Sequence, residues 1–322
     1  MSKILNINPE FSCEIQMVVP YAYWLHQRGE LETIITSKGM KPFYYFCDDV
    51  REEHDFRSVD NLHLQGQVPN IWIHHNAESI FGKDYSELTK EQQEEANGVL
   101  DYSQWTPPPY KDYYTDIRKE FMYDDWLYNG KTIVISNRYN YEHGKPPRGF
   151  FDIECLYNMF NYLTEKGYSI IYKRPNNTEF PLDHNEMMTI QDGCKLEANV
   201  EGLGLISDYD LTKHYDNVYL LDDMVDAYDM GYNEAQLKLF SLVDGFITMG
   251  GGSGIFCSYF GGTNITYITT SKEMRKGYFG PKSHYRMTSG CNVIPVRDSE
   301  DEISARGHRD YTELFEKIKE NF

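Results

Sequence analysis

Apolar runs of strand length alternate with helical stretches in the second half of the chain. Strands are predicted at Thr132–Ser136, Ser169–Tyr172, Val218–Leu221, Val243–Met249 and Ile265–Ile268. Between them, Phe150–Lys166 carries apolar side chains about one helical turn apart, and Asn233–Leu242 also predicts a helix. Strands and helices that alternate in this way indicate a parallel sheet covered by helices.

The first half shows a weaker version of the same pattern. Cys13–Arg28 has helical spacing, with Pro20 at a kink or in a first turn. Short strands are predicted at Lys3–Ile7, Leu31–Thr36, Pro42–Cys47 and Ile71–His74, and a polar helix at Leu88–Leu100. Tyr102–Asp116 then breaks the pattern, because three prolines among aromatic residues predict a stiff, non-helical connector.

These patterns predict an α/β protein with an N-terminal domain over residues 1–125 and a C-terminal domain over residues 126–300. Residues 301–322 end in a helix at Asp310–Phe322, where Asp310 and Glu313 have the spacing of a capping box. A length of 322 residues is enough for two domains with cores of their own.

Charge and cysteine content reduce the number of possible function classes. A net charge of −19 argues against broad binding to nucleic acid or to anionic membranes. The 6 cysteines are scattered without metal-ligand spacing, which indicates reduced thiols and a cytoplasmic protein. We see no secretion signal and no integral membrane segment, since the longest apolar run, Met17–Leu25, is too short to span a bilayer.

The chemistry centres on a loop that is almost bare backbone. Gly250, Gly251, Gly252, Ser253 and Gly254 follow the Val243–Met249 strand and precede a short apolar segment, Ile255–Phe260. Backbone N–H groups without neighbouring Cβ atoms close around an anion, so this loop is a candidate phosphate site. The loop does not fit a Walker phosphate loop, a Gly-x-Gly-x-x-Gly dinucleotide fingerprint or a Gly-x-Ser-x-Gly nucleophile elbow.

Charged residues follow the other predicted strands of this domain. They are Arg138, Lys173, Arg174, Asp222 and Asp223. In a parallel sheet the ligand lies beyond the carboxyl ends of the strands, so we expect these side chains near the glycine loop.

The order of elements from Asn233 to Ile268 resembles the donor-binding domain of GT-B glycosyltransferases. That family has a helix, an "aD-x-x-I" strand, a small-residue loop, a second helix and a "G-x-P-x-I" strand. Here Val243-Asp244-Gly245-Phe246-Ile247 matches the first strand, and Gly262-Thr263-Asn264-Ile265 matches the second without its proline. The resemblance covers residues 130–300 and implies two Rossmann-like domains facing a central cleft.

The resemblance implies transfer of a sugar from a nucleotide-sugar donor to a hydroxyl of a glycan or other acceptor, with no bound metal or other cofactor. Arg138 and Arg174 are expected to contact the donor diphosphate, with Lys173 in reserve, and Asp222 or Asp223 to accept from ribose hydroxyls or the base. A single catalytic base is expected from the first domain, chosen among Glu14, His26, Asp48, Asp49, His74 and His75. We favour Glu14, Asp49 and His75, which follow predicted strands.

Two other readings stay open on the same residues. One is a sugar-nucleotide epimerase or hydrolase, and the other is a non-catalytic protein that binds carbohydrate or nucleotide. Lys272–Arg286 holds five Lys and Arg residues in an acidic chain, which suits either a solvated loop or one that closes over a phosphate. Asp208-Tyr209-Asp210 matches an Asp-x-Asp metal motif, but such a triplet is expected by chance among 50 acids.

Overall fold

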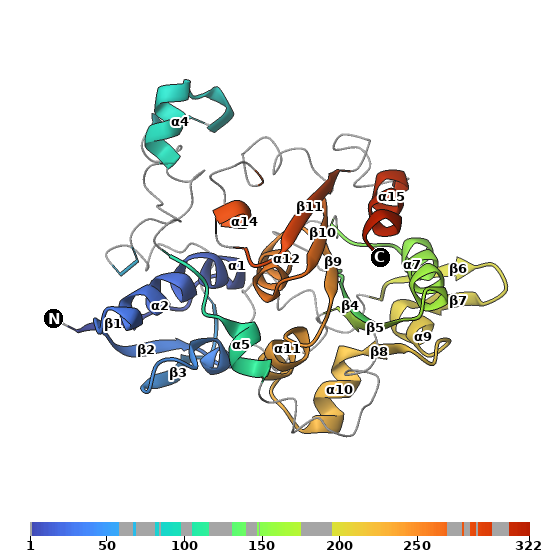
Figure 1. Ribbon diagram of the computed structural model, residues 1–322, viewed down its shortest axis with the longest axis horizontal. Helices are drawn as coiled ribbons and strands as arrows, with labels where there is room; N and C mark the ends of the chain where they lie inside the picture. Colours follow the sequence, from blue (N-terminus) through green and yellow to red (C-terminus); the bar gives the residue numbers. More distant parts are fainter. Residues whose placement is uncertain are drawn as a thin grey trace. The chain divides into compact units, whose positions relative to one another are not determined.

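The computed structural model describes residues 2–57, 67–68, 81–83, 85–97, 105–115, 131–139, 147, 149–174, 195–268, 279, 284–287, 289–297 and 309–322. The chain divides into two compact units (Figure 1). The first runs to Pro108 and includes a short helix near the C-terminal end of the chain; the second begins at Pro109. The predicted boundaries at residues 125 and 300 stay a prediction, because they fall in the gaps of the described ranges.

The first unit contains a three-stranded parallel sheet in the order β1-β2-β3. Its described elements are β1 (Lys3–Asn6), α1 (Phe11–Cys13), the π-helical turn η1 (Glu14–Val18), α2 (Val19–Gln27), β2 (Leu31–Ser37), the 3-10 turn η2 (Lys41–Tyr44), β3 (Val50–His54), η4 (Tyr85–Glu87), α4 (Lys90–Asn97) and α14 (His284–Met287). Pro20 lies in the first turn of α2, as predicted, where the α-helix continues directly from the π-helical turn η1.

The strand predicted at Pro42–Cys47 is wrong. This stretch forms the turn η2, because Met40, Phe43 and Tyr44 are buried at a helical spacing and not on alternate residues. The next strand is instead β3, whose polar sequence gave no apolar pattern. The strand predicted at Ile71–His74 lies outside the described residues.

The second unit contains a six-stranded, fully parallel sheet in the order β11-β10-β9-β4-β5-β8. Its elements are α5 (Tyr110–Thr115), β4 (Lys131–Ser136), α7 (Ile153–Glu165), β5 (Tyr168–Lys173), β6 (Glu197–Val200), β7 (Gly204–Ser207), α9 (Asp208–Thr212), β8 (Val218–Leu220), α10 (Leu221–Tyr228), α11 (Tyr232–Phe240), β9 (Gly245–Met249), α12 (Gly252–Cys257), η6 (Ser258–Phe260), β10 (Thr263–Ile268), β11 (Asn292–Arg297) and α15 (Thr312–Asn321). The strands predicted in this half are all present. We did not predict β11, the sixth strand of the sheet, or β6 and β7, which form a separate antiparallel pair.

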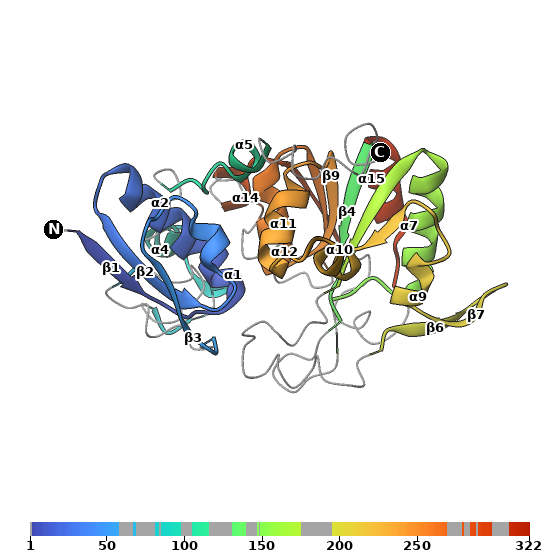
Figure 2. The ribbon, with the colours of Figure 1, turned by 90° about the horizontal axis from the view of Figure 1, so that it is seen from below.

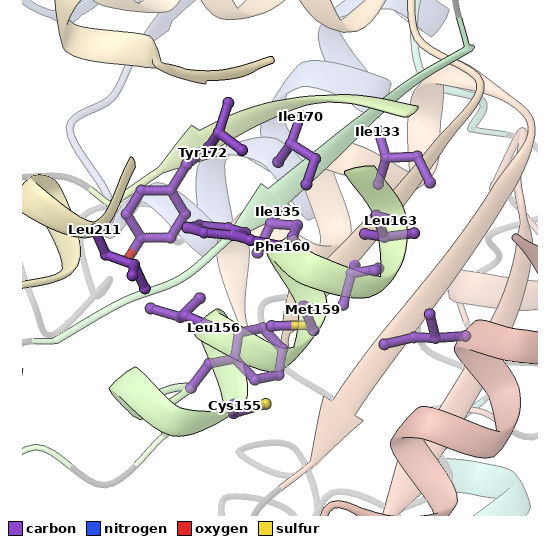
Figure 3. Close-up of a cluster of buried hydrophobic side chains, with 14 of the residues drawn as sticks. Ile133, Ile135, Cys155, Leu156, Met159, Phe160, Leu163, Ile170, Tyr172 and Leu211 are labelled. Carbon is purple, nitrogen blue, oxygen red and sulfur yellow. The ribbon is translucent and has the colours of Figure 1, made fainter. Parts of the chain in front are cut away.

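Helices cover both faces of this sheet (Figure 2). On one face, α7, α9 and α15 pack over side chains such as Ile135, Ile170 and Tyr172, which belong to one buried cluster (Figure 3). On the other face, the ring of Phe240 in α11 packs against Phe246 of β9 and Phe256 of α12. The distances between ring centroids are 5.8 Å to Phe246 and 5.7 Å to Phe256. Burial on both faces explains the continuous apolar runs inside β4 and β5, Ile133–Ile135 and Ile170–Tyr172.

We predicted a non-helical connector at Tyr102–Asp116, and this prediction is wrong for its C-terminal part. From Tyr110 it forms the helix α5, and the Tyr110 ring is fully buried and stacks 6.0 Å from Phe260. Burial of this aromatic ring on the second unit favours a helical turn over an extended proline-rich conformation. No described helix of the protein is long and apolar enough to cross a membrane.

Candidate functional site

The strand order of the second unit identifies the place where a ligand is expected. From β4 the chain first builds outward through β5 to β8 and then returns to add β9, β10 and β11 on the other side of β4. The order therefore reverses between β4 and β9. In open parallel sheets, ligands bind beyond the carboxyl ends of the strands at this point.

The glycine corner, which we define as residues 250–254, begins where β9 ends and so lies at that switch point. Gly251 has a φ of 110°, which an L side chain rarely adopts, and α12 begins at the next residue. Gly251, Gly252 and Ser253 keep partial exposure, while Gly254 is buried and its carbonyl accepts from Asn264 Nδ2 at 3.0 Å. The corner is therefore accessible and not packed shut.

Two side chains from neighbouring strands meet the Ser253 hydroxyl at this corner. Ser136, the last residue of β4, lies with its Oγ 2.6 Å from the Oγ of Ser253. Lys173, the last residue of β5, donates from Nζ to the same Ser253 Oγ at 3.0 Å. Two strands and the start of α12 are thus joined through one hydroxyl group.

Lys173 is a buried cation with little to neutralise it. Lys173 is only 3% exposed to solvent. Within the described parts of the chain, no carboxylate oxygen lies within 4.0 Å of its Nζ. Burial lowers the pKa of Lys173 to about 8, against weaker opposing effects of Cys257 and Asp222. An anion beside Nζ would offset this desolvation.

Arg138 also reaches the corner. It follows β4 by two residues, and a Cβ placed on Gly251 would lie 3.2 Å from Arg138 Nη1. The guanidinium donates from Nε to the Gly149 carbonyl at 2.9 Å. The guanidinium packs so closely against Gly149 that a Cβ on this glycine would lie 2.4 Å from Arg138 Nη2.

Arg174 lies at the expected strand end but is engaged elsewhere. Its guanidinium forms a buried bidentate ion pair with Asp208, donating from Nε to Oδ2 and from Nη2 to Oδ1, the latter at 3.0 Å. Tyr172 donates to the same carboxylate at 2.7 Å, and the Tyr209 ring lies 4.5 Å from the guanidinium carbon. Asp208 therefore belongs to a structural network, and its Asp-x-Asp partner Asp210 pairs with exposed Lys213 at 2.8 Å.

Asp222 and Asp223 lie in the first turn of α10, just beyond β8. Tyr209 donates to Asp222 Oδ2 at 3.2 Å, whereas the buried Oδ1 has no donor among the residues that the structure describes. Burial raises the pKa of Asp222 to about 6, partly opposed by the Tyr209 hydrogen bond. Asp223 is exposed.

The candidate bases in the first unit have different environments. Glu14 is fully buried in the π-helical turn η1, a rare element that is frequent at functional sites. Its carboxylate accepts from Thr36 Oγ1 at 2.6 Å and Tyr44 Oη at 2.8 Å, and it pairs with buried Arg57 at 2.5 Å.

Asp49 is held by Arg51 and by the Thr33 hydroxyl, which lower its pKa. It precedes β3, so it lies at the amino end of a strand and not at the carboxyl end that we had predicted. His75 lies outside the described residues, as does most of the basic stretch Lys272–Arg286.

The sequence pattern missed the supporting residues of the site. Ser136 was counted only as the end of an apolar strand, and Asn137, Gly149 and Tyr209 were given no role. A polar residue that closes a fully buried strand is the signal that would have identified Ser136. Nothing in the local sequence of Gly149 announces its contact with Arg138, because the two meet only in the fold.

Comparison with known proteins identifies the fold. No protein-family model and no curated protein sequence matches the chain. Among solved structures, an ADP-heptose LPS heptosyltransferase II from Escherichia coli is similar at 10% identity and a TM-score of 0.50, over 99% of this chain and 98% of that one. Two others have lower TM-scores. The E. coli heptosyltransferase WaaC with ADP has 0.47 at 9% identity, over 99% of each chain, and a glycosyl transferase of family 9 from Veillonella parvula has 0.46 at 9% identity, over 99% of this chain and 89% of that one.

The first of these similarities extends over nearly the whole of both chains. The resemblance predicted from Asn233–Ile268 is thereby confirmed at the level of the fold. This chain has the α/β fold of the GT-B glycosyltransferases.

Proposed function

We propose that this protein is a glycosyltransferase that moves a sugar from a nucleotide-sugar donor to a hydroxyl of a glycan or other acceptor. The observation that carries the proposal is the buried ammonium group of Lys173 beside Ser253 at the glycine corner. A cation that has been desolvated without a carboxylate partner suits a bound anion. Its position at the topological switch point suits the diphosphate of a nucleotide sugar.

In this proposal, the site stabilises the leaving diphosphate. When the bond between the sugar and the phosphate breaks, negative charge develops on the departing oxygen, and positioned donors lower that barrier. Lys173 and Arg138 supply positive charge from two sides of the corner, and Ser136 and Ser253 supply hydroxyl groups. These cations make a bound metal unnecessary for charge neutralisation, so we propose transfer without a metal.

Arg174 takes a supporting role in this proposal, because Asp208 already satisfies its guanidinium. Asp222 is the better of the two acidic candidates for a donor hydroxyl, since its buried Oδ1 has no donor within the described part of the protein. The base that takes the acceptor proton is one of Glu14, Asp49 and His75. Replacing each by its uncharged counterpart and measuring kcat would identify it.

The proposal is tested by binding and by turnover. A thermal-shift panel of nucleoside diphosphates and nucleotide sugars is run on the wild type, Lys173→Met and Lys131→Met. Lys131 is exposed at the amino end of β4, so its variant is a control for loss of charge on the opposite edge of the same sheet. We expect Lys173→Met to weaken binding of the best ligand by roughly 10- to 100-fold, the value of one or two charge-assisted hydrogen bonds, and Lys131→Met to leave it unchanged.

The best nucleotide sugar is then incubated with and without glycan acceptors. Sugar appearing on an acceptor supports the transferase, while an altered or released sugar from the donor alone supports the epimerase or hydrolase. Tight binding with no turnover under any condition would overturn the enzymatic proposal.

A further inference from the structure

The position of Arg138 depends on a segment that does not belong to the glycine corner. Residues 149–152 run beside the end of β4, and the Gly149 carbonyl accepts from Arg138 Nε at 2.9 Å. Because the guanidinium lies between Gly149 and Gly251, any shift of this segment moves the charge relative to the corner.

On one side, the segment is fastened to the end of β4. The Asn137 side chain donates from Nδ2 to the Phe151 carbonyl at 3.0 Å and accepts from the Phe151 N–H at 2.8 Å. The Phe150 ring meets the Tyr139 ring edge-on at 4.8 Å between centroids. These contacts are local, since only about a dozen residues separate the partners.

On the other side, the segment is held by the last residues before α15, which are 159 positions away in the chain. Arg309 donates from Nη1 to the Phe150 carbonyl, and its guanidinium carbon lies 3.9 Å from the centroid of the Phe150 ring. Tyr311 donates to Asp152 Oδ2 at 3.0 Å and accepts from the Asp152 N–H at 3.3 Å. Arg309 is 8% exposed, so the clamp is shielded from water.

We propose that Arg309 and Tyr311 are positioning residues for phosphate binding, which hold residues 149–152 so that Arg138 points at the glycine corner. This inference rests on the proposed function, because it assigns Arg138 to the diphosphate. Arg309 contacts Phe150 and Tyr311 contacts Asp152, so the effect passes to Arg138 through Phe150 and Gly149. The C-terminal segment thereby sets the affinity of a site built by β4, β5 and β9.

The test is a double-mutant cycle in the full chain. Affinities for ADP, GDP, UDP and CDP are measured by calorimetry for the wild type, Arg138→Met, Arg309→Met and the double variant. We expect Arg309→Met to weaken the best diphosphate roughly 3- to 10-fold, within the range seen for residues that modulate a site from a distance. In the Arg138→Met background, Arg309→Met should have no further effect, whereas a general loss of packing would add to it. The matching nucleoside without phosphate should bind all four proteins equally.

Tyr311→Phe is the milder second variant, in case Arg309→Met does not fold. It removes one hydroxyl and should weaken the diphosphate in the same direction, with the same non-additivity against Arg138→Met. Wild-type binding that Arg138→Met weakens but Arg309→Met and Tyr311→Phe do not would overturn this inference and leave the proposed function standing.

If no diphosphate binds the wild type, the proposed function fails, and crystal structures of the variants decide the positioning step by themselves. We expect the Arg138 guanidinium to leave Gly149 and Gly251 in Arg309→Met. A guanidinium still seated against both glycines would contradict the inference.

Discussion

The carboxylate of Asp208 and the guanidinium of Arg174 form a bidentate ion pair at the carboxyl end of β5 that is almost inaccessible to water. Tyr172 completes the coordination of the carboxylate by donating to Oδ2 at 2.7 Å. Two residues later, Asp210 forms an ion pair with Lys213 in which both side chains are more than half exposed. The two acids of one sequence triplet therefore offer a matched comparison of a buried and an exposed ion pair.

We expect Asp208→Asn to lower the free energy of unfolding by about 3–5 kcal/mol, because it leaves the Arg174 charge buried without a partner. Asp210→Asn should cost less than about 1 kcal/mol, since its pair is screened by solvent. Urea unfolding at pH 7 measures both. Equal effects of the two substitutions would show that Arg174 finds another partner, such as a bound anion, and would restore it as a phosphate ligand.

We expect the buried charge of Lys173 to lower the free energy of unfolding while it favours anion binding. Its pKa is about 8 in the folded chain and near the ordinary 10.5 when unfolded, so the unfolded chain binds more protons between these values. Stability from this group therefore increases as pH rises from 8 to 10.5, and the buried charge is unfavourable below pH 8. We expect Lys173→Met to raise the free energy of unfolding by about 2–3 kcal/mol at pH 7, a gain that should be much smaller at pH 10 and vanish above the unfolded pKa of 10.5.

Urea unfolding at pH 7 and pH 10 checks this expectation, with Lys131→Met as the exposed control. The variant that gains stability should be the one that loses diphosphate binding, the usual cost of a site built with an uncompensated charge. A Lys173→Met protein that is less stable than the wild type at pH 7 would mean that the contacts of Nζ with Ser253 and the Phe240 ring outweigh the desolvation of the charge.

The sheet of the second unit was predictable because its strands are buried on both faces. Uninterrupted apolar runs such as Ile133–Ile135 and Ile170–Tyr172 leave a signal that does not depend on context. The first unit was less predictable, because β3 has the polar sequence VREEH, while the aromatic run before it packs as a turn. In these two segments tertiary packing outweighs local propensity.

The candidate site was predictable only as a set of strand ends. Chain order alone places Arg138, Lys173 and the glycine corner at one edge of the sheet. The sequence could not predict which of these cations already has an acidic partner. Arg174 pairs with Asp208, which lies 34 residues away in the chain and is brought close only by folding. Sequence spacing therefore finds the edge, while side-chain pairing decides which residues are available there.

Gly149→Ala tests whether the guanidinium of Arg138 must sit where it does. The new methyl group would lie 2.4 Å from Nη2, so the flexible end of Arg138 must move away from the corner. We expect diphosphate affinity to fall by roughly 3- to 10-fold with little change in Tm, because only a side-chain end is displaced. Gly231→Ala is the control, since it meets no atom within 4 Å and has an ordinary φ of −63°.

Gly262→Ala tests the tight turn that leads into β10, the strand next to β9 and the glycine corner. Gly262 has a φ of +75°, and a Cβ there would lie 2.2 Å from the backbone carbonyl of Asp244, an atom that cannot swing aside. We expect a loss of at least about 2–3 kcal/mol of unfolding free energy, from strain plus displaced backbone. Gly167→Ala separates the two causes, because it has a similar φ of +81° with open space around the Cβ. It should cost only the conformational part, about 1 kcal/mol, and if the two variants unfold at the same urea concentration, the contact between Gly262 and Asp244 does not hold β10 in register.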